Sequence, residues 1–100
     1  MLLTGLPTDA QKALRIGLVN NVVAAGELIP AAEKVALAIS ANGPVAVQMA
    51  KEAALRGFEM PLEKGLELER DLLTLVQSTE DAKEGVRAFI EKRKPNWVGK

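Results

Sequence analysis

The residues best suited to binding chemistry lie near the end of the chain, in the segment EGVRAFIEKRKPNW, residues 84–97. Lys92 follows Phe89 by three residues and Arg93 follows it by four, so on a helix the ring and these cations share one side. An aromatic face and adjacent cations, here extended by Lys94, suit a nucleotide-like group with a base and a phosphate. The same cations could instead complement the dipole at the end of a solvated helix.

Pro95 and Trp97 follow this basic cluster. Proline cannot continue a helix, so Pro95 is expected to end the helix just after the cations. Trp97 either anchors the tail by packing or joins the aromatic platform, and the first interpretation is favoured. Nucleic-acid binding through the cluster is disfavoured, because 13 basic and 13 acidic residues leave a net charge of +0 and one aromatic residue shares the helix face.

No set of side chains in the sequence forms a recognisable catalytic or metal site. The chain has no cysteine and no histidine, so thiol chemistry and the commonest general base and metal ligand are missing. Glu63 and Glu67, four residues apart, could bind a cation or share a proton, but their pattern is typical of an exposed helix face. The glycines occur singly and form no phosphate-cradling loop. We therefore predict no catalytic residue, metal or cofactor in this chain.

Length and apolar patterning limit the class of protein. One hundred residues make one small domain or a piece of a larger one, and much of its surface stays exposed. No apolar run approaches the roughly 20 residues that cross a bilayer. The beginning of the chain lacks the basic and apolar segments of a signal peptide. The sequence therefore predicts no membrane span and a cytoplasmic location.

Five helices are predicted to position these residues, with one short extended segment between the first two. The helix over 9–16 follows the capping-box pair Thr8 and Gln11 and ends at Gly17. Residues 18–23 are rich in β-branched and apolar side chains and are expected to be extended. The remaining helices are predicted over 27–42, 44–57 and 62–77, and from a cap at Ser78 or Thr79 to Pro95.

The apolar faces of these helices predict how they pack. Pro44 suits the first position of the third helix, whose mostly alanine contact face allows another helix to approach closely. The leucines of the fourth helix cover roughly half of its cylinder, which is more than one neighbour would bury. That helix is either the centre of a small bundle or part of an interface with another domain or subunit. The predicted fold class is all-α.

Four segments occur in the order found in a known family: LLTG, TDAQKALRIGLVNNVV, ANGPVAVQMAK and STEDAKEGVRAFIEKRKPNWVGK. On these segments, essentially the whole chain resembles the carboxyl-terminal portion of the enoyl-CoA hydratase/isomerase family, the crotonase superfamily. In that family a carboxyl-terminal helical region builds trimers that often pair into hexamers. The resemblance therefore implies a homo-oligomer and an acyl-CoA substrate.

The resemblance also implies that part of the family's fold has no counterpart here. An amino-terminal spiral of ββα repeats carries the oxyanion-hole amides and the acidic catalytic residues in the family, and this chain matches only the region after it. The two glutamates of a typical hydratase and the glycine-rich oxyanion loop are unmatched, so the chain alone is expected to be inactive. Met1 is either the start of a shortened product, an internal methionine of a longer protein, or the edge of a fragment.

Within the AFxEKR segment, the resemblance assigns two positions to the coenzyme A (CoA) site of a neighbouring subunit. The matching residues are Phe89, beside the bound thioester, and Lys92, near the phosphates; Arg93 and Lys94 are possible phosphate contacts. The predicted function is the carboxyl-terminal part of an enzyme acting on acyl-CoA thioesters, with hydration of 2-enoyl-CoA favoured over isomerisation. The alternative is a non-catalytic helical module that self-associates or binds full-length members of the family.

Overall fold

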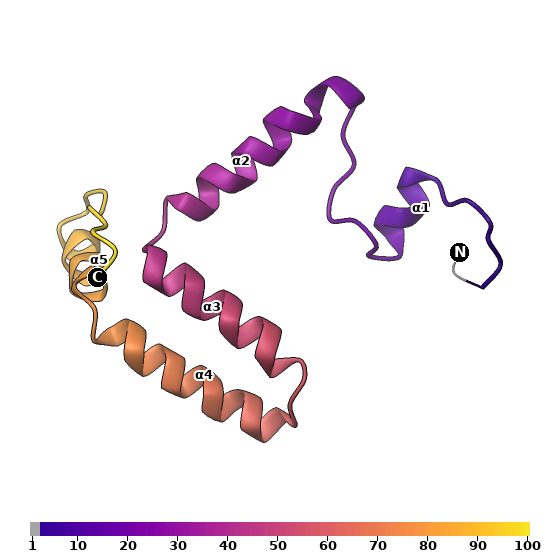
Figure 1. Ribbon diagram of the computed structural model, residues 1–100. Coiled ribbons are helices and arrows are strands. Elements are labelled where there is room, and N and C mark those ends of the chain that lie inside the picture. Colours follow the sequence, from indigo (N-terminus) through magenta and orange to yellow (C-terminus); the bar gives the residue numbers. More distant parts are fainter. Residues whose placement is uncertain (1–2) are drawn as a thin grey trace. The chain divides into compact units, whose positions relative to one another are not determined.

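The computed structural model describes residues 3–100, so the question of Met1 lies outside the described residues. The order of elements is α1 (Ala10–Arg15), the 3-10 helix η1 (Ala25–Glu27), α2 (Leu28–Ser40), α3 (Pro44–Gly57), α4 (Leu62–Gln77) and α5 (Glu80–Ile90) (Figure 1). Residues 3–100 contain helices and no strand, which confirms the predicted all-α class. The chain divides into two units, residues 1–35 and 36–100.

In the first unit, α1 begins at a different cap from the one predicted. Asp9, and not Thr8, caps the helix, because its Oδ1 accepts a hydrogen bond of 2.7 Å from the Lys12 N–H. A carboxylate at this position also interacts favourably with the positive end of the helix dipole. Gly17 adopts the left-handed conformation expected of a C-terminal cap, with φ of 72°.

Between α1 and α2 the chain is neither helical nor paired in a sheet until η1. The second helix therefore begins at Leu28, one residue later than predicted, and it ends at Ser40 rather than at residue 42. Asn42 explains the earlier end. Its side-chain Nδ2 donates to the carbonyl oxygens of Ala38 at 2.8 Å and Ile39 at 3.2 Å, which satisfies carbonyls that a continuing helix would use.

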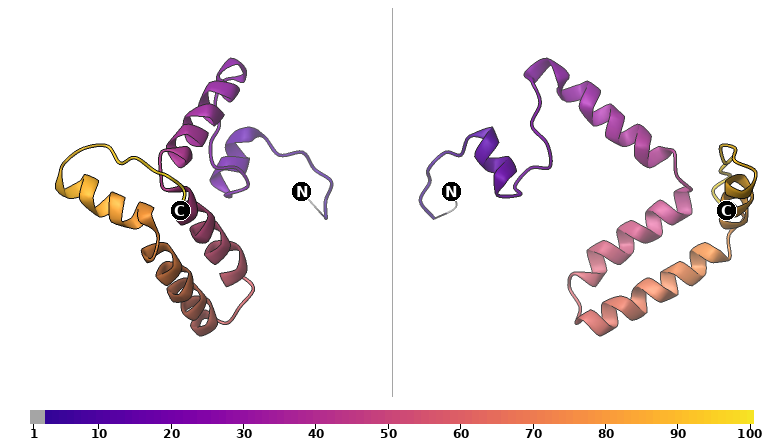
Figure 2. Two further views of the ribbon diagram at one scale, coloured as in Figure 1. Left: turned by 60° about the vertical axis from the view of Figure 1, so that its left-hand side comes forward. Right: turned by 180° about the vertical axis from the view of Figure 1, so that it is seen from behind.

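In the second unit, α3 and α4 lie side by side and run in opposite directions (Figure 2). Pro44 occupies the first turn of α3 as predicted. Small residues allow the two helices to come close: a Cβ atom added to Gly65 would lie 3.5 Å from the carbonyl oxygen of Gly57. As predicted, α3 packs on another helix, α4, and Ala46 and Ala53 of its alanine face line a groove together with residues of α4.

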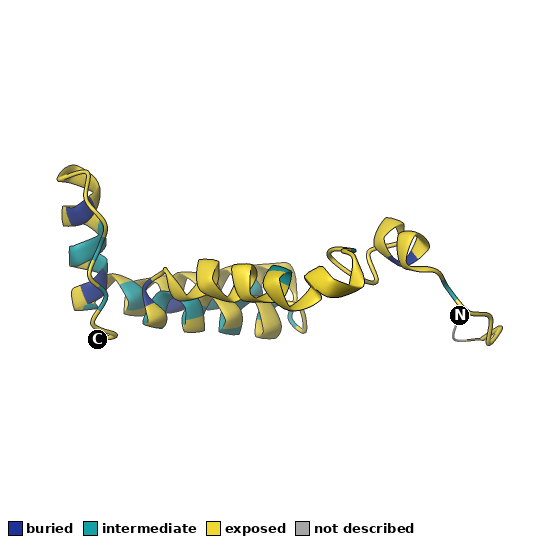
Figure 3. Ribbon diagram, turned by 90° about the horizontal axis from the view of Figure 1, so that it is seen from above, coloured by how far each residue is buried: buried dark blue, intermediate teal, exposed yellow. Residues whose placement is uncertain are grey.

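Most apolar side chains of the chain are exposed (Figure 3). The buried apolar residues among residues 3–100 are Ala13, Leu72 and Ala88. The exposed ones include much of the apolar faces of α2 and α4, namely Leu28, Ile29, Val35, Leu37, Ile39, Leu62, Leu66, Leu73 and Leu75. Uncovered apolar surface of this kind usually marks an interface. The second of the two predictions for the fourth helix, an interface with another domain or subunit, is therefore favoured.

Candidate functional site

The helix that carries the candidate site, α5, has a well-defined beginning. Thr79 caps it by accepting a hydrogen bond of 3.1 Å from the Ala82 N–H, and Glu80 and Asp81 place negative charge in the first turn. Phe89 lies in the last turn, and its side chain is largely exposed, at 85%. The ring is therefore available to a ligand or to another protein chain.

The helix ends at Ile90, before the basic cluster, and the prediction that Pro95 stops it was wrong. Lys92 adopts a left-handed conformation with φ of 53°, which costs a residue other than glycine roughly 1–2 kcal/mol. The N–H groups of Lys92 and Arg93 donate to the carbonyl oxygens of Phe89 at 3.2 Å and Ala88 at 3.0 Å. These are the paired bonds of a Schellman turn.

This turn changes the geometric argument for the basic cluster. Lys92 and Arg93 lie beyond the helix, so the helical spacing that placed them on one side with Phe89 does not apply to them. Lys92 nevertheless stays close to Phe89 along the backbone, through the hydrogen bond from its N–H to the Phe89 carbonyl. The backbone contact between these two residues is thus made by a turn rather than by a helix face.

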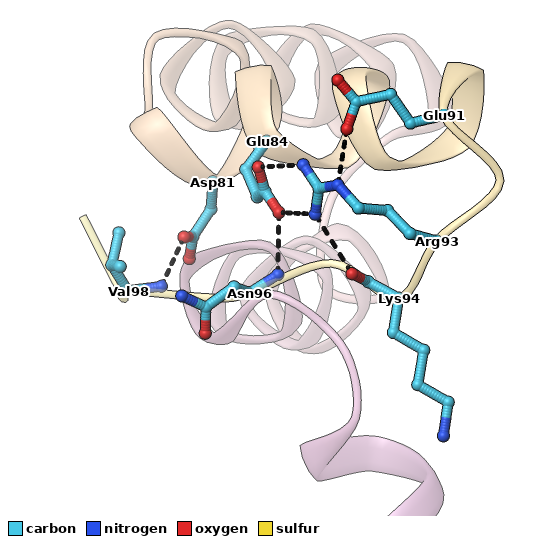
Figure 4. Close-up of polar contacts among 7 residues, drawn as sticks. All are labelled: Asp81, Glu84, Glu91, Arg93, Lys94, Asn96 and Val98. Atoms are coloured by element: carbon cyan, nitrogen blue, oxygen red, sulfur yellow. Dashed lines mark hydrogen bonds and ion pairs between the residues drawn. The ribbon is translucent and has the colours of Figure 1, made fainter.

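Arg93 is held by two carboxylates (Figure 4). Its Nη1 and Nη2 donate to Oε1 and Oε2 of Glu84 at 2.6 and 3.0 Å, and its Nε donates to Glu91 at 2.6 Å. A bidentate guanidinium–carboxylate pair is stronger and more directional than a single ion pair. A phosphate would have to compete with both carboxylates for this side chain.

Lys92 and Lys94 differ from Arg93 in this respect. Within residues 3–100 neither lysine forms an ion pair, and both are exposed. The main-chain carbonyl of Lys94 accepts a hydrogen bond from Arg93 at 3.1 Å, while its side chain extends away from the cluster (Figure 4). These two ammonium groups are therefore the cations of the cluster that are open to an anionic ligand.

Glu84 is the centre of the polar cluster. Its Oε1 also accepts a hydrogen bond of 2.8 Å from the main-chain N–H of Asn96. The hydrogen bonds from Arg93 and then from Asn96 lower the pKa of the Glu84 carboxyl from 4.5 to about 2. Because the folded pKa is the lower one, the ionised carboxylate stabilises this arrangement above about pH 4.5, and the contribution is lost as the pH falls towards 2.

A carboxyl titration tests this assignment. The carboxyl carbon of Glu84 is expected to titrate in NMR spectra with a midpoint near 2, and Arg93→Met should move the midpoint up towards 4.5, because it removes the largest cause of the shift. Lys83→Met, which removes a cation from the same helix, is the matched control and should leave the midpoint in place. An unchanged midpoint in Arg93→Met would contradict the role given to Arg93.

The residues after the turn, 93–100, form a tail that folds back along α5. The buried carboxylate of Asp81, 4% exposed, accepts hydrogen bonds from the N–H groups of Val98 at 2.7 Å and Gly99 at 3.0 Å. In return, the carbonyl oxygen of Lys100 accepts from the N–H groups of Glu80 at 2.8 Å and Asp81 at 3.2 Å. The first turn of α5 and the tail thus satisfy each other's backbone groups.

Trp97 attaches the same tail to the end of α2. Its indole Nε1 donates a hydrogen bond of 2.7 Å to the Ala41 carbonyl oxygen. The ring lies over the backbone of Gly85, where an added Cβ would meet it at 3.2 Å, and near Gly43, where the distance would be 3.6 Å. The interpretation of Trp97 as a packing anchor is confirmed, and the glycines make room for its ring.

The rest of the described chain offers a groove but no cluster of metal ligands. An open groove of about 740 Å³ runs between α3 and α4 and is lined mainly by apolar residues, among them Met49, Leu66, Leu72 and Leu73. Within residues 3–100 no three potential metal-ligating side chains gather, and no helix there is long and apolar enough to cross a membrane. Glu67 forms an exposed ion pair with Lys64 at 2.7 Å, as expected for an exposed helix face.

Comparison with known proteins identifies the family. A model of the enoyl-CoA hydratase/isomerase family matches residues 1–100. The chain belongs to this family. A crotonyl-CoA hydratase from Syntrophomonas wolfei is 41% identical over 100 residues, which are all of this chain and 38% of that protein. An (E)-benzylidenesuccinyl-CoA hydratase from Thauera aromatica is 43% identical over 99 residues, or 99% of this chain and 39% of that protein.

Solved structures of the enoyl-CoA hydratase/isomerase family also resemble the chain. The crystal structure of an enoyl-CoA hydratase from Mycobacterium tuberculosis matches with a TM-score of 0.91 and 36% identity, covering 98% of this chain and 39% of that one. The family predicted from the sequence is thus confirmed, and so is the helical fold. The chain spans somewhat more than a third of the length of these relatives.

Proposed function

We propose that the chain is the carboxyl-terminal part of an enzyme that hydrates 2-enoyl-CoA thioesters, in which it supplies subunit contacts and contacts to CoA. The observation that carries the proposal is the combination of a family match over the whole chain with apolar helix faces that the chain itself leaves uncovered. Such faces need partners, and the rest of the enzyme and neighbouring subunits would provide them. A trimer or hexamer is the expected assembly.

Hydration is favoured over isomerisation because both curated relatives described above are named hydratases. Their names differ in the acyl group, although both match this region at more than 40% identity. The helical region is therefore assigned to the shared part of the substrate, the CoA moiety, rather than to the acyl chain. In the complete enzyme, backbone donors would polarise the thioester carbonyl and carboxylates would transfer protons. We infer that those groups belong to the amino-terminal spiral that the family resemblance implies.

Within this chain, we assign the CoA contact of a neighbouring subunit to Phe89 and Lys92. Both side chains are exposed, and the backbones of the two residues are joined by a hydrogen bond within the left-handed turn. Lys94 is a possible second phosphate contact, since it too lacks an ion pair within residues 3–100. Arg93 remains a possible contact, but it would have to leave Glu84 and Glu91 to bind a phosphate.

A substitution of Lys92 tests this assignment in the complete enzyme. Lys92→Met is expected to raise the KM for crotonyl-CoA about tenfold and to change kcat less than about twofold, because one contact between a cation and a phosphate is worth roughly 1.5 kcal/mol. Lys83→Met, which removes an exposed lysine of α5, is the matched control and should leave KM unchanged. Equal KM values for the Lys92 variant and the unmodified enzyme would contradict the assignment.

A further inference from the structure

We propose that Glu84 is a positioning residue for the CoA contact: by binding Arg93 and Asn96 it fixes the turn that presents Lys92. The inference rests on the proposed function of Lys92 and assigns a role to a carboxylate that contacts no ligand in that proposal. Glu84 lies within α5, six residues before the end of the helix, so its position is set by the helix itself. Its side chain is 18% exposed, well below the value for an ordinary surface glutamate.

The turn at Lys92 is held by hydrogen bonds on its helix side and on its tail side. Lys92 is the single residue other than glycine with a positive φ within residues 3–100, and such a conformation persists where neighbouring contacts impose it. On the helix side, the N–H groups of Lys92 and Arg93 bond to carbonyls of the last turn. On the tail side, Glu84 holds the Arg93 guanidinium through two bonds and the Asn96 N–H through a third.

These contacts determine where the Lys92 ammonium can go. With Arg93 and Asn96 fixed to α5, the backbone of Lys92 is restrained to the left-handed conformation, which limits the region that its ammonium can reach. Without Glu84, the tail-side support of the turn would rest on the bond from Arg93 to Glu91 and on the more distant contacts of Asp81 and Trp97. The left-handed conformation would then compete with the many conformations open to a free lysine.

Because Glu84 is negatively charged, the direction in which KM changes in Glu84→Gln tests this proposal. Glu84 carries a negative charge beside a site proposed to bind phosphates, so a purely electrostatic view predicts that Glu84→Gln strengthens CoA binding. The same substitution also releases Arg93 from a bidentate partner and leaves it free to attract a phosphate. The positioning view predicts the opposite, because the loosened turn no longer presents Lys92. The direction of the change in KM therefore separates the two.

The experiment compares Glu84→Gln, Lys92→Met and the double variant in the complete enzyme. We expect Glu84→Gln to raise the KM for crotonyl-CoA about fivefold with kcat nearly unchanged, and the double variant to be no worse than Lys92→Met alone, since coupled residues are not additive. The KM for crotonyl-pantetheine, which lacks the nucleotide phosphates, should not change. Glu67→Gln, which breaks another exposed ion pair, is the matched control and should have no effect.

The outcomes distinguish this inference from the proposed function on which it rests. If Lys92→Met raises KM while Glu84→Gln leaves it unchanged or lowers it, the positioning role is overturned and the CoA contact stands. If Lys92→Met has no effect on KM, the CoA contact of Lys92 and the positioning role of Glu84 are both overturned. A loss of kcat with both substrates in Glu84→Gln would indicate general loss of structure and would also overturn the positioning role.

Discussion

Trp97→Ala is expected to detach the tail, residues 93–100, from α5 and from the end of α2. The substitution removes a half-buried ring that lies over Gly85 and Gly43, together with the indole hydrogen bond to Ala41. We expect a loss of about 2 kcal/mol in the free energy that holds the tail in place, roughly half the cost of deleting a fully buried aromatic side chain. That is about a 30-fold shift in the equilibrium between attached and free tail.

Amide hydrogen exchange measures this equilibrium at the right place. The Val98 and Gly99 amides donate to Asp81 only when the tail is attached, so their protection should fall about 30-fold in Trp97→Ala. Trp97→Phe is the matched control, because it keeps an aromatic ring, although a smaller one, and loses the indole donor, and it should cost about 1 kcal/mol. Unchanged protection of both amides in Trp97→Ala would show that the ring does not hold the tail.

The helices were predictable from the sequence because their signals are local. Pro44 marks the start of α3, Thr79 caps α5 and Gly17 ends α1, and each acts through residues within one turn. The errors arose where two local signals competed. Asp9 and Thr8 are both good caps, and the structure uses the one with a charge. At the end of α5, Lys92 takes a conformation usually left to glycine, which periodicity could not indicate.

The polar cluster was not predictable in the same way. Asp81 lies in the first turn of α5, and Glu84 follows within the same helix. Their main partners are the tail residues 93, 96, 98 and 99, which are 9 to 18 residues away in the sequence. Contacts at that separation depend on how the tail folds back, and no local pattern encodes it. The tryptophan after the proline was the available hint that the tail is anchored.

The fold of this chain determines the exposure and the protein contacts of the predicted site residues, but not their contacts to a ligand. In the structure Phe89 and Lys92 are exposed and joined by a backbone hydrogen bond, and Arg93 has carboxylate partners that the sequence did not indicate. Whether Lys92 and Lys94 bind a phosphate stays a prediction, because it depends on the subunit that would carry the ligand. The uncovered faces of α2 and α4 agree with this dependence, since many of their leucines, with a valine and isoleucines of α2, are exposed within residues 3–100.

We propose that this chain completes a hydratase whose chemical groups lie in the amino-terminal spiral. A non-catalytic module would share the exposed apolar faces and could also associate with such a spiral. Association by itself therefore does not separate the two functions. Turnover separates the two functions, because only a part of the hydratase would give an active enzyme when it assembles with the spiral.

The most direct measurement is hydration of crotonyl-CoA by the chain alone, by a separately produced amino-terminal spiral, and by the two after mixing. We expect neither part to show turnover and the mixture to show it, with a KM about tenfold higher when the chain carries Lys92→Met. Turnover by the chain alone would contradict the account of where the chemistry lies. An inactive mixture in which the two parts have formed a stable complex would contradict the proposed role of the chain in a hydratase.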